Sequence, residues 1–314
     1  MEEKEKNNNK KTLSLIFSGL ALLIIIAGVI FLFTGNGKKT DGGNTEPEKP
    51  YDPNNVVIDD FTYAPLKLET KEDNLVYSPL SIKYALSMLN EGASGTTKEE
   101  IDKLIKDLSL TKYENIDKVL SLANSIFIRD TYKNEINKEY INTLKEKYNA
   151  EVKFDESKNA NNVNNWISEK TFNIIKNMLS DDLVQNPDVK FLLINALAID
   201  MEWLGRFEQE NTTSRPFTKA DGKEIDVAMM HKTSETNEFY QDEKYSLLSM
   251  PFKKYNGTNL EFIAIMPNEG SLKEMLTSDD MSKTINDLLS KLHAPVKQEL
   301  SISLPRFDFE YKQV

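Results

Sequence analysis

The segment KFLLINALAI, residues 190–199, decides the fold because nearly every side chain after its lysine is apolar. A run of this length without alternation is typical of a strand that is covered on both faces. The segment LSLANSIFI, residues 120–128, has the same character. The two segments therefore predict central strands of a sheet with a layer of structure on each side.

Apolar residues at helical spacing predict amphipathic helices around these strands. Residues 78–89, SPLSIKYALSML, have Ser78 as the expected N-cap and Pro79 at the first helical position. Residues 96–108, TTKEEIDKLIKDL, place Thr97 at the spacing of a capping box with the glutamate three positions later. Both segments are expected to begin helices at these residues.

Two further helices are expected later in the chain. Residues 134–148, NEINKEYINTLKEKY, repeat the amphipathic pattern. Residues 160–179, ANNVNNWISEKTFNIIKNML, predict another helix, with Val163, Trp166 and Ile167 facing inward.

Two hairpins are expected in the second half of the chain. Residues 217–230 and 250–267 each carry a glycine-containing tight turn between strand-like runs, at Asp221-Gly222 and Asn256-Gly257. The helices therefore come mostly first and the hairpins mostly later. This order predicts an α+β fold with mixed or antiparallel sheets.

The apolar alternation changes phase near the end of the sequence. Apolar residues occupy the even positions of 300–304, whereas after Pro305 they are Phe307, Phe309 and Tyr311. The apolar face has therefore changed sides at the proline, which a strand tolerates at a bend. We expect this strand to pass from one sheet to another.

Composition excludes several classes of function. The net charge is −11 and no block is rich in lysine and arginine, so we expect no nucleic-acid partner. The absence of cysteine excludes disulfides, thiol nucleophiles and cysteine-ligated zinc. The motifs of serine hydrolases, zinc proteases and nucleotide-binding loops are absent, and His231 and His293 have the surroundings of ordinary packing or surface residues. We therefore expect neither an enzyme nor a bound metal or cofactor.

The N-terminal region predicts a membrane anchor. Leu13 to Phe33 form 21 residues without a charge, which as a helix would span about 31 Å, close to the thickness of a bilayer core. A cleaved signal peptide is the alternative, but its apolar region is shorter and ends in a small-residue cleavage site, which is not evident here. We expect a cytoplasmic tail at 1–11 and a retained anchor at 12–34.

Lysines before the anchor outnumber those directly after it, which favours a cytoplasmic N-terminus. Residues 35–55 are rich in glycine, proline and asparagine and predict a flexible linker. We therefore expect the folded domain, residues 56–314, on the extracellular side of the cell membrane. The frequent lysine and asparagine are typical of an AT-rich genome, and we expect a prokaryotic source.

Polar residues inside apolar segments are the candidate functional residues. Asn195 lies in a strand that is expected to be buried on both faces, so its amide needs hydrogen-bond partners. Ser78 and Ser81 begin a helix that is expected to be buried, and Trp203 follows the Asn195 strand. The polar residues are either satisfied core groups or a cluster that latches a movable part of the structure. Trp203 is either a core-packing residue or the lid of an opening.

Several segments together resemble the serpin family of serine protease inhibitors. The segments that carry the resemblance are NLVYSPLSIKYALSMLNEGASGTTKEEI (74–101), LANSIFI (122–128), AEVKFDESKNANNVNNWISEKT (150–171), FLLINALAIDMEWLGRFEQENTTSRPF (191–217), DVAMMHKT (226–233), LEFIAIMPNEGSL (260–272) and LSISLPRFDFEY (300–311).

The resemblance extends over residues 56–314 and implies a serpin-like α+β fold. That fold has a helical N-terminal part, a large main sheet and further antiparallel sheets. The resemblance also implies that Ser78, Ser81 and Asn195 belong to the shutter, where the main sheet opens. It implies that Trp203 marks the breach, where strand insertion begins.

The mechanism implied by the resemblance is inhibition of a serine endopeptidase by a suicide substrate. An exposed reactive loop is cut and then inserts into the main sheet. In the family this loop and the last core strands follow the LPRF stretch, so we expect a C-terminally truncated chain from which the specificity residue is absent. We expect a monomer. The alternative is a non-inhibitory serpin-fold module for binding or structure at the cell surface, and the hinge before the loop would distinguish the two.

Overall fold

The computed structural model describes residues 60–62, 76–105, 110, 112–219, 221–234, 238–268, 270, 272–292 and 299–308. The expected tail, anchor and linker, residues 1–55, lie outside the described residues, as do His293, Phe309 and Tyr311. Among the described helices, none combines the length and the apolar character needed to cross a membrane.

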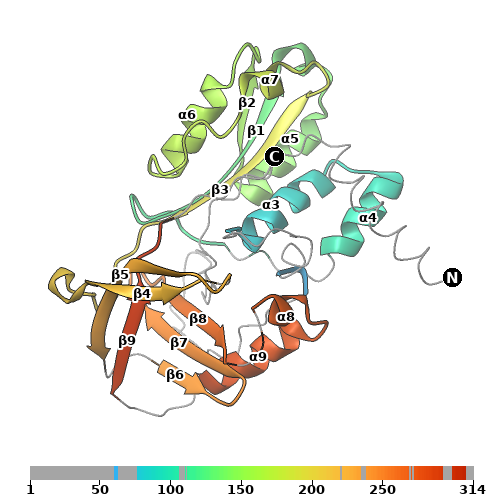
Figure 1. Cartoon of the computed structure of the whole chain (residues 1–314). Coiled ribbons are helices and arrows are strands. Elements are labelled where there is room, and N and C mark those ends of the chain that lie inside the picture. The colour runs from blue at the N-terminus through green and yellow to red at the C-terminus, as the bar shows by residue number, and fades with distance from the viewer. Residues whose placement is uncertain are drawn as a thin grey trace, which may run out of the picture.

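A three-stranded sheet forms the centre of the upper half of the molecule in Figure 1. Its strands are β1 (Leu120–Arg129), β2 (Glu151–Asp155) and β3 (Phe191–Ile199), in the order β2-β1-β3. β1 runs parallel to β2 and antiparallel to β3. Seven consecutive residues of β3, 192–198, are buried, which confirms a strand covered on both faces.

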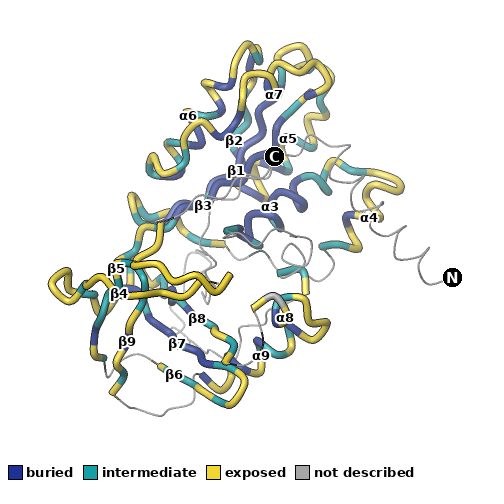
Figure 2. Tube along the Cα trace, in the orientation of Figure 1, coloured by how far each residue is buried: buried dark blue, intermediate teal, exposed yellow. Residues whose placement is uncertain are grey.

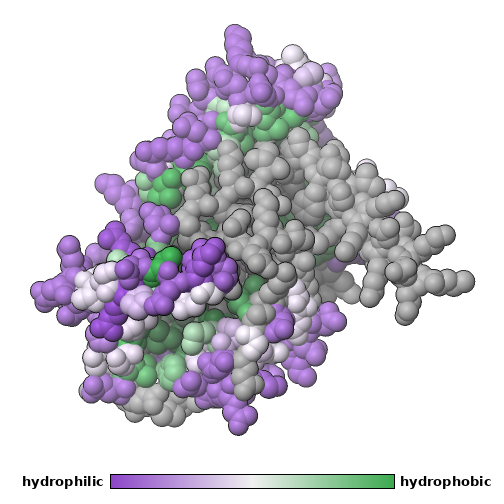
Figure 3. Space-filling view, in the orientation of Figure 1, coloured by the Kyte–Doolittle hydropathy of each residue, from purple (hydrophilic) through white to green (hydrophobic). Residues whose placement is uncertain are grey.

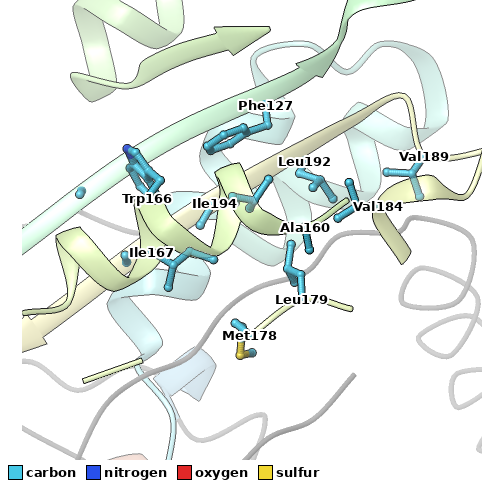
Figure 4. Close-up of a cluster of buried hydrophobic side chains, with 13 residues drawn as sticks. Phe127, Ala160, Trp166, Ile167, Met178, Leu179, Val184, Val189, Leu192 and Ile194 are labelled. Atoms are coloured by element: carbon cyan, nitrogen blue, oxygen red, sulfur yellow. The ribbon is translucent and has the colours of Figure 1, made fainter. Parts of the chain in front are cut away.

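Helices lie on both sides of this sheet (Figure 1). On one face, α6 (Asn161–Lys170) packs its Trp166 edge-on against Phe127 of β1, with 6.1 Å between ring centroids, and Figure 4 shows the surrounding cluster. On the other face, α3 (Pro79–Asn90) and α5 (Lys138–Tyr148) pack against alternate residues of the same strands. This second face carries the polar residues singled out above.

The start of α3 agrees with the sequence prediction. Pro79 is its first residue, and the Ser78 hydroxyl oxygen accepts a hydrogen bond from the Ser81 backbone N–H at 3.1 Å. The prediction for the next helix was wrong at its N-terminus. α4 (Gly95–Ile105) begins before Thr97, so Thr97 lies inside the helix and cannot form the expected capping box.

The fourth helix is also shorter than expected. Val163, Trp166 and Ile167 face the core as predicted, but α6 ends at Lys170. Phe172 and Asn173 have φ angles of 54° and 63°, which lie in the left-handed region and end a right-handed helix. The chain then forms the short helix α7 (Asp181–Gln185) before it enters β3.

Two antiparallel sheets form the lower half of Figure 1. One has the order β4-β5-β9 and the other β6-β7-β8. The helices α8 and α9 pack against the second sheet. The bounds are β4 (Thr213–Thr218), β5 (Glu224–Ser234), β6 (Glu238–Gln241), β7 (Tyr245–Pro251), β8 (Glu261–Pro267), α8 (Leu272–Thr277), α9 (Met281–Leu292) and β9 (Leu300–Pro305).

Both predicted hairpins are present. Gly222 has a φ of 77° between β4 and β5, and Asn256 and Gly257 have φ values of 48° and 81° between β7 and β8. Figure 2 shows that the β4–β5 hairpin is largely exposed, whereas β1 and β3 are buried. In Figure 3 hydrophobic residues appear between this hairpin and the strands β7 and β8. The order of elements confirms the α+β fold class.

β9 confirms a strand over the alternating residues that precede the bend expected at Pro305. It pairs antiparallel with β5, and its last residue, Pro305, lies opposite Met229. The Arg306 N–H then donates to the Ala228 carbonyl at 2.8 Å. The strand expected beyond Phe307 lies outside the described residues.

Candidate functional site

The buried amide of Asn195 has a partner that the sequence analysis missed. Asn195 lies in β3 directly opposite Asn124 in β1, and its Nδ2 donates to the Asn124 Oδ1 at 2.8 Å. The Asn124 Nδ2 in turn donates to the Tyr148 carbonyl at the end of α5, at 2.9 Å. The exposed fractions of Asn195 and Asn124 are 1% and 5%. This amide chain ties the two central strands to α5.

Some buried polar atoms remain without a hydrogen-bond partner among the described residues. They include the Oδ1 of Asn195 and the Oγ of Ser81. A buried polar atom without a partner costs about 1–3 kcal/mol. The Oδ1 of Asn195 can therefore accept a hydrogen bond from a further donor.

In the described part of the chain, Asn195 shares no hydrogen bond with Ser78 or Ser81, the other two predicted shutter residues. Ser78 is bonded to Ser81 through the helix cap, and Asn195 is bonded to Asn124. α3 and β3 nevertheless pack together, since Leu80 and Leu193 belong to the same buried cluster. The role of the three residues as a shutter stays a prediction.

Trp203 lies where the chain leaves β3 and meets the β7–β8 hairpin. Its ring stacks on Phe252 with centroids 4.5 Å apart and meets Phe262 edge-on at 5.6 Å. Its backbone forms an isolated bridge with Phe252, and the Leu204 N–H donates to the Pro251 carbonyl at 2.9 Å. Trp203 therefore joins the end of β3 to the second antiparallel sheet.

The exposed neighbour of Trp203 is an ion-paired carboxylate. Glu202 contacts both Lys253 and Arg206. Hydrogen bonds from Lys253 and Arg206, together with their charges, lower the pKa of Glu202 to about 2. The carboxylate is therefore charged at neutral pH, and it acts as an ordinary surface partner of two cations.

The outer edge of β3 is the second feature of the site. Within the described residues β3 pairs only with β1, although it is buried on both faces. The edge of a strand presents unpaired N–H and C=O groups and can accept another strand by main-chain hydrogen bonds. Asn195 lies in the middle of this strand.

The described residues can be compared with the side-chain clusters that bind metals or pair a nucleophile with a base. They contain no cluster of three or more histidine, cysteine, aspartate or glutamate residues that could hold a metal ion. The His231 Nδ1 lies 3.1 Å from the Ser303 Oγ, and these two residues are directly opposite each other in β5 and β9. This contact is an ordinary cross-strand pair on a sheet surface.

Comparison with known proteins gives consistent results. Residues 60–314 match the family described as serpin, serine protease inhibitor. A serpin-like protein of Methanosarcina mazei is 28% identical over 96% of this chain and 72% of its own length. Neuroserpin of Mus musculus is 28% identical over 79% of this chain and 65% of its own length.

Solved structures agree with the sequence matches. The thermophilic serpin tengpin in its native state has a TM-score of 0.67 and 27% identity, over 80% of this chain and 66% of that chain. Tengpin in its latent state gives the same TM-score, 0.67, with 26% identity, over 80% of this chain and 70% of that chain. The chain spans about two thirds of the length of neuroserpin. Because the family match extends over most of its residues, the chain belongs to the serpin family.

Proposed function

We propose that this chain is part of a serine-type endopeptidase inhibitor that acts as a suicide substrate. The observation that carries the proposal is the edge of β3, a strand buried on both faces that pairs on one side only within the described residues. Such an edge is suited to receive an added strand. A strand that enters beside β3 would meet Asn195, whose Oδ1 lacks a partner among the described residues.

The proposed reaction begins with an ordinary protease step. The serine oxygen of the protease attacks a carbonyl carbon in the reactive loop, the peptide bond breaks, and the amine of the new C-terminal fragment leaves. The loop is then an ester on the protease. Its insertion beside β3 carries the protease along before water can hydrolyse the ester. The inhibitor is consumed, so the process is not enzyme catalysis.

The family resemblance puts the reactive loop after the LPRF stretch, and this chain matches 65% of the length of neuroserpin. The proposal therefore concerns a full-length protein that carries such a loop. In it, Ser78, Ser81 and Asn195 act as the shutter and Trp203 as the breach. We expect the protein to work as a monomer, with neither cofactor nor metal.

Incubation of the full-length protein with a panel of serine proteases tests this proposal. We expect at least one protease to give a covalent complex that survives boiling and appears on a denaturing gel at the summed mass. Replacement of the protease's catalytic serine by alanine should abolish the complex, because no ester can form. Cleavage by every protease without a stable complex would favour the non-inhibitory alternative, a binding or structural module at the cell surface.

We also propose that residues 12–34 anchor the protein in a prokaryotic cell membrane with the serpin domain outside. The support is the uncharged run of 21 residues from Leu13 to Phe33 and the excess of lysines before it. Protease added to intact cells should release the domain and leave a short membrane-bound stub. Full protection of the domain, or its release with a new N-terminus near residue 36 in untreated cells, would contradict the retained anchor.

A further inference from the structure

Lys232 is a buried cation in the sheet formed by β4, β5 and β9. It lies in β5 opposite Ile302 of β9, and its exposed fraction is 8%. Its Nζ donates to the Gly205 carbonyl at 2.8 Å and lies 4.7 Å from the centroid of the Phe207 ring. No ion pair of Lys232 with a carboxylate occurs among the described residues. Burial lowers the pKa of this lysine.

Both partners of Lys232 belong to one short stretch of chain, residues 202–207, which we call the junction segment. Its other end holds Trp203, stacked on Phe252 of the second antiparallel sheet. The Lys253 N–H also donates to the Glu202 carbonyl at 2.8 Å. The junction segment is therefore held from one side by the β7–β8 hairpin and from the other side by Lys232 of β5.

The geometry at Lys232 is not that of an ordinary surface lysine. A surface lysine keeps its ammonium in water, and its substitution changes the stability of a protein little. Here the side chain is covered, and it contacts a backbone carbonyl and a ring of one segment. Hydrogen bonds to charged groups stabilise more than neutral ones do, and a covered cation also gains from the face of a ring. An apolar side chain of equal size has no donor and would leave the Gly205 carbonyl without this hydrogen bond.

We propose that Lys232 is a positioning residue that fixes the junction segment and so holds Trp203 at the end of β3. The effect of Lys232 on strand insertion rests on the proposed function, because Trp203 matters for insertion only if a strand enters beside β3. The effect of Lys232 on the position of Trp203 is independent of the proposed function. The hydrogen bond from Lys232 keeps the junction segment in place until an incoming strand displaces it. Without this bond the segment moves more freely, and a strand inserts before a protease has cut the loop.

The test uses the full-length protein labelled with 5-fluorotryptophan and three variants. Lys232→Met keeps the length of the side chain but removes the donor and the charge, whereas Lys232→Arg keeps both. Lys219→Met is the control, because Lys219 follows β4 of the same sheet and its ammonium forms an exposed ion pair with Asp221. The fluorine NMR signals of Trp203 and Trp166 are assigned by replacing Trp166 with phenylalanine.

We expect Lys232→Met to shift or broaden the Trp203 signal and to leave the Trp166 signal unchanged. The variant should also lose inhibitory activity on storage about tenfold faster, as the loss of one charge-assisted hydrogen bond implies. Lys232→Arg should restore the signal, and Lys219→Met should match the wild type in both measurements.

An unchanged Trp203 signal in Lys232→Met would overturn the positioning role, whatever the inhibition assay shows. A shifted signal with an unchanged rate of activity loss would overturn the link to insertion. If the wild type forms no complex with any protease, the proposed function fails, and the NMR comparison alone still decides whether Lys232 positions Trp203.

Discussion

Asn195→Ala is expected to destabilise the full-length protein by about 1–3 kcal/mol and to speed its conversion to an inactive or polymeric form. The substitution removes the amide that donates to the Asn124 Oδ1 and leaves that buried oxygen without a partner among the residues that the structure describes. Because the asparagine pair joins β1 to β3, its loss should loosen the sheet as well as lower the melting temperature. Thermal unfolding and gel filtration after incubation at 37 °C measure the two effects.

Ile194→Val is the matched control for this prediction. Ile194 is the preceding residue of β3, is fully buried, and faces the opposite side of the sheet. The loss of one methyl group should cost about 0.5–1.5 kcal/mol without leaving any polar group unpaired. If Ile194→Val converts to the inactive form as fast as Asn195→Ala at equal loss of stability, the asparagine has no latch role.

A double substitution adds a second check on the same pair. Asn124→Ala alone should destabilise by a similar amount, since it leaves the Asn195 Nδ2 and the Tyr148 carbonyl unpaired. In the double variant neither asparagine amide remains between the strands. The loss of stability should therefore be smaller than the sum of the losses in the two single variants. Simple additivity would show that the two side chains do not act together.

Trp203→Ala is expected to divert the inhibitor from complex formation to simple cleavage. The substitution removes two aromatic contacts, with Phe252 and Phe262, each worth about 0.5–1.5 kcal/mol beyond the buried area. The end of β3 then keeps its backbone hydrogen bonds to the β7–β8 hairpin but loses the packing of the ring, so the point where a strand would enter is held less tightly. The fraction of cleaved inhibitor on a denaturing gel, at fixed protease, measures the change.

Trp203→Phe separates the contribution of the ring from that of the whole side chain. Phenylalanine can keep a stacked contact with Phe252, so we expect it to restore most of the complex. Equal partition between complex and cleaved product in wild type, Trp203→Ala and Trp203→Phe would contradict a role of Trp203 in insertion.

The central strands and the hairpins could be predicted from the sequence because their signals are local. The uninterrupted apolar runs of β1 and β3 follow from burial on both faces, and Gly222 and Gly257 mark turns that need a positive φ. The ends of helices were less predictable. Thr97 has the chemistry of a cap, yet α4 begins before it, and α6 stops at Lys170 because the backbone turns left-handed at Phe172.

The site was predicted only in part, because its contacts join residues far apart in the chain. Asn195 was recognised as a polar residue in a buried strand. Asn124 carries the same signal, an amide inside the apolar run LANSIFI, and could have been found by the same reasoning. No local pattern indicates Lys232, since its partners Gly205 and Phe207 come from a segment that only the fold brings beside β5.

Amide hydrogen exchange in β3 is the measurement that tests strand insertion most directly. The full-length protein is compared before and after a protease cuts the reactive loop, with peptides that span residues 191–199. If the cut loop inserts beside β3, the amides on its outer edge gain lasting partners, and their exchange should slow by about tenfold or more. Exchange that stays the same after cleavage would contradict insertion and leave the serpin fold here without an inhibitory mechanism.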